Sequence, residues 1–505
     1  MRATLVILLL TLAGCSGSGS GSDADPTSED VCQSAPVGGF GFDQFGGWKG
    51  IASDPAPRFR VELVDGTWWL LTPEGHAFFA NGPTGIDPIG DYIRDTGRSP
   101  YHEAITAKYG SDDAWADGTV DRMCELGIRS HGGWLSVSDS QFFSGRLPYA
   151  LNTSFYGAMP EVVGAPGSAK PRRDVFDPTA ADRARAVAND GPVARCAADP
   201  WCIGIYTDNE LPWAPSLLAG GSHLDVYLAE PAGAPGKLAL QHFFETRYDG
   251  DVAAFNQTWG TSWSSFAELQ QANRLGVCQP TQGFADDLCA LREGRERFDD
   301  RMAFEAEVAG TLARLADDAL AAVDPLLLNL GPRITAEPAH PAVVAALAAT
   351  VDVMSINNYD ISAAAQILLP PPVQAQLNEV GMLPIDVFER VRRVHQITGK
   401  PVLISEWFFR VRRSDIGSYP PILPEVESRE LQASSYRHYM DELLAMPFVV
   451  GESWFQWVDQ PREGRFDGEN QLIGLIDITD ELNQPLAATV AEVNATILVR
   501  RSGID

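Results

Sequence analysis

The sequence predicts an α/β fold, because eight short apolar runs alternate with longer segments of helical character. Runs of this kind are typical of buried parallel strands. The runs are residues 77–82, 127–134, 150–156, 201–209, 326–330, 351–357, 402–405 and 448–455. Intervening segments such as 181–188 and 299–322 have helical spacing and composition. Eight strand and helix units indicate a (β/α)8 TIM barrel.

The first 14 residues resemble an export signal. Arg2 precedes an apolar stretch at 5–12, and Leu12-Ala13-Gly14-Cys15 matches a bacterial lipobox. The apolar stretch is too short to span a bilayer. We expect cleavage before Cys15 and lipidation of that cysteine; the alternative is an ordinary secretory signal with an incidental cysteine. Residues 15–39, with a Ser/Gly run at 16–22, would then form a flexible tether between a membrane and the domain.

An antiparallel hairpin is expected to lead into the barrel. Strand-like residues 60–64 are followed by the turn Asp65-Gly66, by residues 68–71 and by a second turn at 73–75. The predicted domain, residues 40–500, is longer than the roughly 250 residues typical of the fold. The Gly/Pro-rich stretch 220–236 and the proline run 370–372 mark two loop insertions that account for the excess.

Composition restricts the partners. With 38 basic and 67 acidic residues, the net charge of -29 argues against nucleic acid and anionic lipid headgroups, so the lipid at Cys15 is the expected membrane link. An even set of six further cysteines predicts disulfides in an oxidising compartment. Cys196 with Cys202 and Cys278 with Cys289 would staple local loops, and Cys32 with Cys124 would pin the N-terminal segment, although the pairing stays open. No cysteine pair has Cys-x-x-Cys spacing and no histidine follows at finger-like distance, so no metal site is expected at the cysteines. No cofactor is expected, and residues 467–470 lack the EF-hand spacing, although a structural calcium is left open.

Two predicted strands end in glutamate. Glu210 follows the fourth run in Tyr206-Thr207-Asp208-Asn209-Glu210, and Glu406 ends the seventh in Ile404-Ser405-Glu406-Trp407. The carboxyl ends of barrel strands meet at one mouth. Glycoside cleavage needs two carboxyl groups there, because one protonates the leaving oxygen while the other stabilises or attacks the anomeric carbon. The alternative is that either glutamate is structural.

This placement resembles glycoside hydrolase clan A, whose barrels carry the acid/base on strand four, after an asparagine, and the nucleophile on strand seven. Residues 206–210, 174–178, 247–249 and above all the block 451–461 resemble the family 50 β-agarases over residues 59–480. Segment 129–134 departs from the family's pattern. The resemblance implies that Glu210 is the acid/base and Glu406 the nucleophile of a retaining enzyme, with carboxyl groups roughly 5 Å apart, and that Asn209 binds the sugar 2-hydroxyl.

Other side chains at the predicted strand ends are candidates for substrate binding. Tyr359, beside Asn357, is placed to donate to the nucleophile, and flat indole rings suit sugar faces. Buried packing is the usual alternative for tryptophan. The full set of candidates is Asn209, His131, Trp134, Trp213, Asn357, Tyr359, Trp407, Trp454, Gln456 and Arg465.

The sequence therefore predicts an exported, lipid-anchored, retaining β-glycoside hydrolase that acts on a polysaccharide or oligosaccharide, with agarose-type galactan as the first choice. A β-galactosidase or β-glucanase of the same clan is one alternative. A glycan-binding surface lipoprotein without catalysis is another. The oligomeric state is left open.

Overall fold

The computed structural model describes residue 32 and residues 36–162, 172–211, 213, 222–278, 288–335, 339–420 and 423–503. The predicted signal peptide, Cys15 and most of the predicted tether lie outside these residues. Within the described ranges, no helix is both long and apolar enough to cross a membrane.

An antiparallel sheet opens the described chain. Its strands, in the order β1-β4-β3-β2, are Trp48–Ala52, His76–Phe78, Thr67–Leu71 and Arg60–Val64. Strands β2 and β3 pair in register from Arg60↔Leu71 to Val64↔Thr67. The turn between them needs two residues with positive φ, and Asp65 (49°) and Gly66 (83°) supply them. The predicted hairpin is confirmed.

Parallel strands form the centre of the molecule. Strands β5 (Ala80–Asn81), β12 (Val449–Trp454), β9 (Val402–Trp407) and β8 (Met354–Asn357) are hydrogen-bonded in that order, with every pair parallel. Strands β6 (Tyr149–Asn152) and β7 (Cys202–Tyr206) form a second parallel pair. Every residue of β7, β8, β9 and β12 is buried. Burial on both faces explains the continuous apolar runs in the sequence.

Two of the eight expected strands are only isolated bridges, so the prediction of full strands there was wrong. Segment 127–134 contributes the parallel bridge His131↔Tyr149, and segment 326–330 contributes Ile205↔Asn329. Glycines with positive φ stand in or next to these segments: Gly133 (122°) lies within the first, and Gly331 (76°) directly follows the second. Such backbone cannot continue a regular strand. The mixed α/β class is confirmed.

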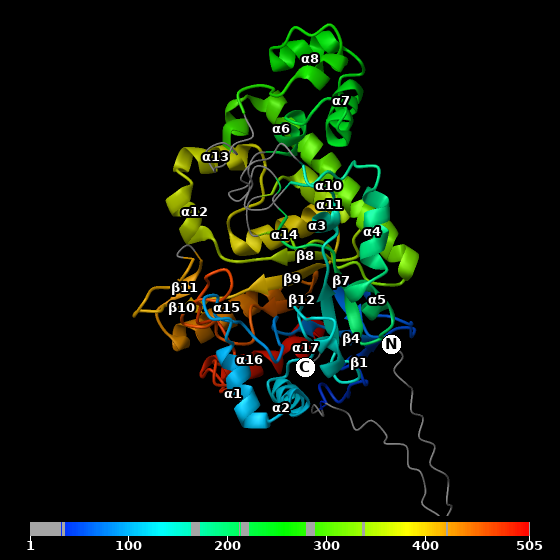
Figure 1. Ribbon diagram of the computed structural model, residues 1–505. Coiled ribbons are helices and arrows are strands. Elements are labelled where there is room, and N and C mark those ends of the chain that lie inside the picture. Colours follow the sequence, from blue (N-terminus) through cyan, green and yellow to red (C-terminus); the bar gives the residue numbers. More distant parts are fainter. Residues whose placement is uncertain are drawn as a thin grey trace, which may run out of the picture.

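Helices cover the parallel strands (Figure 1). The predicted helices at 181–188 and 299–322 are confirmed as α4 and α10. The helices are α1 Pro100–Tyr109, α2 Asp112–Glu125, α3 Phe155–Ala158, α4 Ala180–Ala188, α5 Gly191–Ala197, α6 His223–Leu228, α7 Pro235–Arg247, α8 Val252–Trp259, α10 Arg295–Val323, α11 Pro341–Ala348, α12 Ser362–Leu368, α13 Pro371–Glu379, α14 Val387–Thr398, α15 Arg429–Leu444, α16 Leu486–Asn494 and α17 Ile497–Ser502. Short 3-10 turns occur at Asp139–Phe142, Phe266–Gln271 and Leu288–Arg292, and the small pair β10 (Arg410–Val411) and β11 (Glu425–Val426) lies beside α15.

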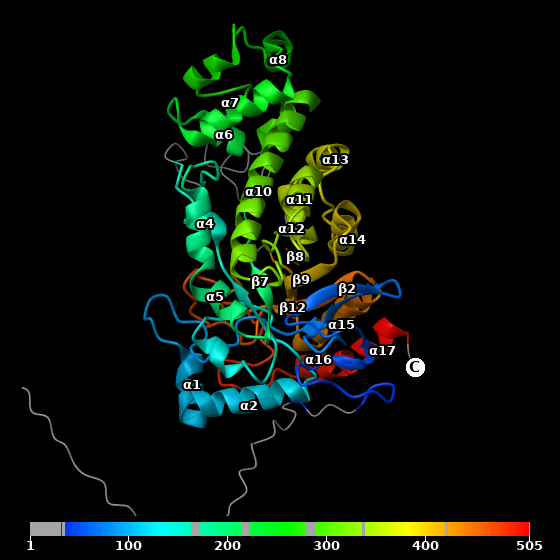
Figure 2. The same cartoon turned by 90° about the vertical axis from the view of Figure 1, so that its right-hand side faces the viewer.

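The insertion predicted at 220–236 introduces a helical extension. Helices α6, α7 and α8 gather at the end of the molecule far from α1 and α2, and α10 runs from that extension along the body (Figure 2). The proline run 370–372 falls where α13 begins, with Pro371 as the first helical residue. Proline is favoured at that position because its missing N–H has no helical partner there.

Disulfides fasten two of these elements. Cys32 is bonded to Cys124 at the end of α2, and Cys196 of α5 is bonded to Cys202 at the start of β7. Cys278 is also disulfide-bonded, while the side chain of Cys289 lies outside the described set. The Cys196 bridge fixes the beginning of the strand that leads to Glu210.

Candidate active site

Glu210 and Glu406 meet at the ends of β7 and β9. The Asn357 Nδ2 atom, at the end of β8, lies 3.2 Å from Glu210 Oε1 and 3.0 Å from Glu406 Oε2. The same nitrogen lies 3.1 Å from the side-chain oxygen of Asn209. One amide nitrogen thus contacts both carboxylates. Glu210 Oε1 and Glu406 Oε2 therefore lie no farther apart than the sum of these two contact distances.

Unusual backbone conformations surround this pair. Trp134 (φ 58°), Glu210 (49°) and Arg333 (48°) are three of the six non-glycine residues with positive φ in the described chain. Each such residue costs on the order of 1 kcal/mol or more, and a fold retains it only where surrounding contacts fix it. The backbone N–H of Glu210 donates to the carbonyl of Arg333 at 3.1 Å, which joins two of the three.

Four donors hold the Glu406 carboxylate, which is 5% exposed. Arg333 Nη2 (2.7 Å) and Trp134 Nε1 (2.5 Å) donate to Oε1. The Tyr359 hydroxyl (2.5 Å) and Asn357 Nδ2 (3.0 Å) donate to Oε2. Both oxygens are therefore satisfied, as a buried acceptor-only group requires, and the side chain is fixed in one orientation.

Arg333 is a site residue that the sequence analysis missed. Its side chain is fully buried between the rings of Trp134 and Tyr206, with ring centroids 4.8 and 4.9 Å from Cζ. It also donates to the backbone carbonyl of Ser405 at 2.8 Å. A cation directly after the apolar run 326–330 and its Gly-Pro break was the available signal.

Tyr359 lies where the sequence predicted it, against Glu406. Burial and the negative charge of Glu406 raise the pKa of its phenol well above the usual range. The hydroxyl therefore stays protonated and available as a donor over the whole physiological range of pH.

Trp134 offers an open aromatic face beside the two glutamates. It is 40% exposed, although its N–H is bonded to Glu406. Gly132, two residues before Trp134, lets the backbone pass close to its neighbours. A Cβ at this position would lie 2.4 Å from the carbonyl oxygen of Gly82 and 2.3 Å from Ser453 Oγ. The segment that departs from the family pattern thus supplies a donor to Glu406.

Four other predicted substrate-binding side chains are packed in the interior instead. Trp407 is 1% exposed and stacks on Tyr439 at 3.9 Å, and Trp454 is 2% exposed and donates to the carbonyl of Ile473. Trp213 is 5% exposed beside His223. His131 is fully buried, and burial lowers its pKa to about 4. These environments match the buried-packing alternative and argue against direct contact with a sugar.

Gln456 and Arg465 lie in the loop after β12. Gln456 Nε2 donates to Asp91 at 2.7 Å, and its side-chain oxygen lies 3.3 Å from Arg465.

Arginines 410, 412 and 413 form a basic cluster after β9. Their guanidinium groups bind Glu425, Glu427 and the backbone carbonyls of Pro420, Gln460 and Asn470. That basic cluster is therefore paired within the protein.

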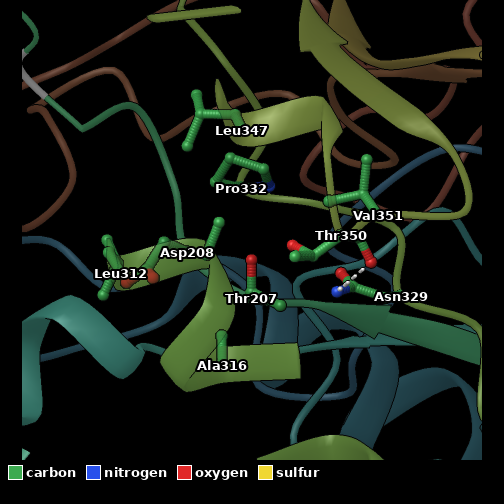
Figure 3. Close-up of a pocket in the computed structure, with 10 residues that line it drawn as sticks. Thr207, Asp208, Leu312, Ala316, Asn329, Pro332, Leu347, Thr350 and Val351 are labelled. Atoms are coloured by element: carbon green, nitrogen blue, oxygen red, sulfur yellow. Dashed lines mark hydrogen bonds between the residues drawn. The ribbon is translucent and has the colours of Figure 1, made fainter. Parts of the chain in front are cut away.

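A small cavity lies to one side of the candidate site, between the end of β7 and helices α10 and α11 (Figure 3). Thr207, Asp208, Asn329 and Thr350 supply its polar lining, and Leu312, Ala316, Leu347 and Val351 are among its apolar lining. Asp208 in turn accepts hydrogen bonds from Ser154 Oγ and the N–H of Tyr156. Neither glutamate is among the described residues that line it, so the cavity is separate from the carboxylate pair.

Glu452 is a buried carboxyl group on β12, bonded to the N–H of Trp407 at 2.7 Å. Burial raises the pKa of Glu452 from 4.5 to about 7. Between these two pH values the carboxyl group is therefore protonated in the folded state and ionised in the unfolded state. The stability it contributes is present below pH 4.5 and is lost as pH rises through 7, by up to ~3 kcal/mol. We expect Glu452→Gln, which stays neutral, to raise the thermal midpoint relative to the native protein at pH 8 more than at pH 5. An equal difference at both pH values would contradict this expectation.

Comparison with known proteins connects the site to a group of enzymes. No family model matches the chain. It is 26% identical over 486 residues to β-agarase A of Vibrio sp. (strain JT0107), covering 85% of this chain and 44% of that protein. It is 24% identical over 527 residues to β-agarase B of the same organism, covering 90% and 50%. The chain thus spans about half the length of these curated relatives.

Solved structures of agarases are also similar to this chain. An exo-β-agarase matches with a TM-score of 0.71 and 26% identity, covering 92% of this chain and 68% of that one. The agarase AgWH50C matches with a TM-score of 0.71 and 25% identity, covering 91% and 68%. This chain is a homologue of β-agarases. The resemblance expected from the sequence is confirmed at that level. A further structure, BpGH50, shares the fold at 17% identity and a TM-score of 0.64, covering 96% and 91%.

Proposed function

We propose that this chain is a retaining β-glycoside hydrolase in which Glu406 is the nucleophile and Glu210 the acid/base. The observation that carries the proposal is the shared Asn357 amide, which lies within hydrogen-bond distance of both carboxylates. Inverting enzymes need carboxyl groups roughly 6.5–9.5 Å apart to admit a water. Contact of a single amide nitrogen with both carboxylates supports the closer, retaining arrangement.

The reaction follows from the roles of the two groups. Glu406 attacks the anomeric carbon while Glu210 gives its proton to the departing glycosidic oxygen, so a glycosyl ester forms as the C–O bond breaks. Glu210 then removes a proton from water, which attacks the anomeric carbon and releases Glu406. In this scheme Asn209, beside the acid/base, binds a sugar hydroxyl, and the exposed face of Trp134 stacks on a sugar ring.

The proposal includes a closed (β/α)8 barrel of the clan A type. The parallel pairings β6-β7 and β5-β12-β9-β8 support it, as do the parallel bridges at Ile205↔Asn329 and Ile334↔Ile356. The N–H of Gly132 donates to the carbonyl of Pro83 at 3.0 Å, which connects the second segment back to the end of β5. Closure would place all eight carboxyl ends at one mouth, where barrel enzymes carry their catalytic residues.

Agarose-type galactan is the proposed substrate, because the similar curated proteins and two of the solved structures are named as agarases. Reducing-end release from agarose, other galactans, β-glucans and aryl β-galactosides tests this choice, and proton NMR of the first product tests the stereochemistry. We expect agarose to be cleaved with retention. Initial release of the inverted anomer would refute the retaining pair. Binding of agarose oligosaccharides without release from any substrate would favour the non-catalytic alternative.

Export and lipid anchoring at Cys15 are part of the proposal and rest on the lipobox in the sequence. We expect Cys15→Ala to leave the folded domain intact and to move it from the membrane fraction to the soluble fraction, because the acyl chains supply the anchoring. Fractionation of cells that express the variant, in which Cys32 and the other cysteines are unchanged, measures how the protein divides between the two fractions. Unchanged membrane association of the variant would contradict it.

A further inference from the structure

Exposed aromatic side chains concentrate in one region of this protein. Among the described residues, five aromatic side chains are at least 40% exposed. They are Phe40, Tyr92, Trp134, Tyr419 and Phe466. Trp134 borders the two glutamates, and three of the other four lie in loops that follow strands of the same parallel sheet. Tyr92 comes after β5, Tyr419 after β9 and β10, and Phe466 after β12.

Direct contacts connect these loops. The rings of Tyr92 and Phe466 lie 6.0 Å apart with planes inclined by 34°. The guanidinium of Arg465 lies 5.1 Å from the centre of the Phe466 ring. Tyr419 is fastened alongside, because its N–H donates to the side chain of Asn470 at 2.8 Å. We call Tyr92, Tyr419 and Phe466 the distal aromatic platform.

A series of contacts within the protein links the platform to the candidate active site. Trp134 is bonded to Glu406, and the carbonyl of the preceding Gly133 accepts from the N–H of Gly85. A Cβ on Gly85 would lie 3.8 Å from Gln456, which bonds Asp91 next to Tyr92 and approaches Arg465 next to Phe466. The loops that carry the platform therefore adjoin the segment that carries Trp134.

Charge at the platform selects against an anionic ligand. Arg465 is paired with three carboxylates, Asp91 at 3.7 Å, Asp467 at 3.0 Å and Glu469 at 2.8 Å. The carboxylates thus surround the guanidinium, so it offers no free cation to a sulfate or carboxylate group on a ligand. Flat, exposed rings instead suit the apolar faces of neutral sugars.

We propose that the distal aromatic platform is a remote subsite that stacks on the rings of an uncharged oligosaccharide whose scissile bond lies between Glu210 and Glu406. The proposal rests on the proposed function and adds the chemistry and position of an extended binding region. It also implies that long substrates gain binding energy that short ones do not.

The test compares kcat/KM for an unsulfated agarose hexasaccharide with kcat/KM for a short aryl β-galactoside. We expect the double variant Tyr92→Ala/Phe466→Ala to lower the ratio of the two values by about tenfold, because each of the two lost stacking contacts is worth roughly threefold. Tyr92→Phe/Phe466→Tyr should retain the ratio. Phe40→Ala, which removes an equally exposed ring elsewhere, is the matched control and should change neither value. A ratio that stays unchanged in the double alanine variant overturns the proposal.

Calorimetry separates this proposal from the proposed function. Binding of the hexasaccharide is measured in the Glu210→Gln background with and without the two alanines. If the native protein cleaves nothing but the alanines weaken binding, the hydrolase proposal fails and the platform stands. If the native protein cleaves the hexasaccharide and the alanines leave affinity unchanged, the platform proposal fails alone. No measurable hexasaccharide binding in the background variant also overturns the platform.

Discussion

Glu406→Gln is expected to lower kcat by about 10⁴-fold or more, because no glycosyl ester can form without the attacking carboxylate. Glu210→Gln is expected to lower kcat by about 10²–10⁴-fold on natural leaving groups, which need a proton. With an activated aryl leaving group, the Glu210 variant should still form the covalent intermediate and then stall, since no base activates water. Rapid-quench kinetics and intact mass measurement detect the stalled species.

Added azide distinguishes the two variants by stereochemistry. The Glu210 variant should yield a β-glycosyl azide, because azide attacks the intermediate from the face that water uses. The Glu406 variant should yield, if any product, the α-azide, because azide then occupies the place of the missing nucleophile. Glu452→Gln is the matched control: it makes the same change on the neighbouring strand and should retain kcat within about twofold. A covalent intermediate in the Glu406 variant would contradict the assignment.

Arg333→Met is expected to lower kcat by about 10²-fold or more with a smaller effect on KM. The arginine is fully buried and donates to Glu406 at 2.7 Å, so its loss leaves that oxygen with Trp134 alone. A charged hydrogen bond of this kind contributes roughly 1.5–3 kcal/mol, and misplacement of the nucleophile adds to the loss. Arg333 is a positioning residue in this scheme, because it acts through Glu406.

A structural role for Arg333 would give a different result. Arg333→Lys should recover only part of kcat, since a lysine retains the charge but lacks the planar guanidinium that lies between Trp134 and Tyr206 and aims Nη2 at Glu406. Arg501→Met removes another buried arginine, bonded to the carbonyls of Trp68 and Met446, and should lower the thermal midpoint without a selective loss of kcat. Equal loss of kcat and thermal stability in both methionine variants would contradict the positioning role.

Local patterns in the sequence were enough to predict the elements that depend on near neighbours along the chain. The Asp65-Gly66 hairpin, the helices that became α4 and α10, and the buried strands β7, β8, β9 and β12 all follow from periodicity, composition and turn residues. The same patterns placed Asn209, Glu210, Asn357, Tyr359 and Glu406 in one site, because parallel strands bring their carboxyl ends together.

Only the tertiary structure decided which of the remaining side chains reach that site. Trp134 and Trp407 both lie at the ends of predicted strands. One is 40% exposed and the other 1%, because α15 covers the second with Tyr436 and Tyr439. Arg333 contacts Glu406 across 73 residues of chain. Exposure and partnership across such distances depend on how whole elements pack, and no spacing along the sequence encodes that packing.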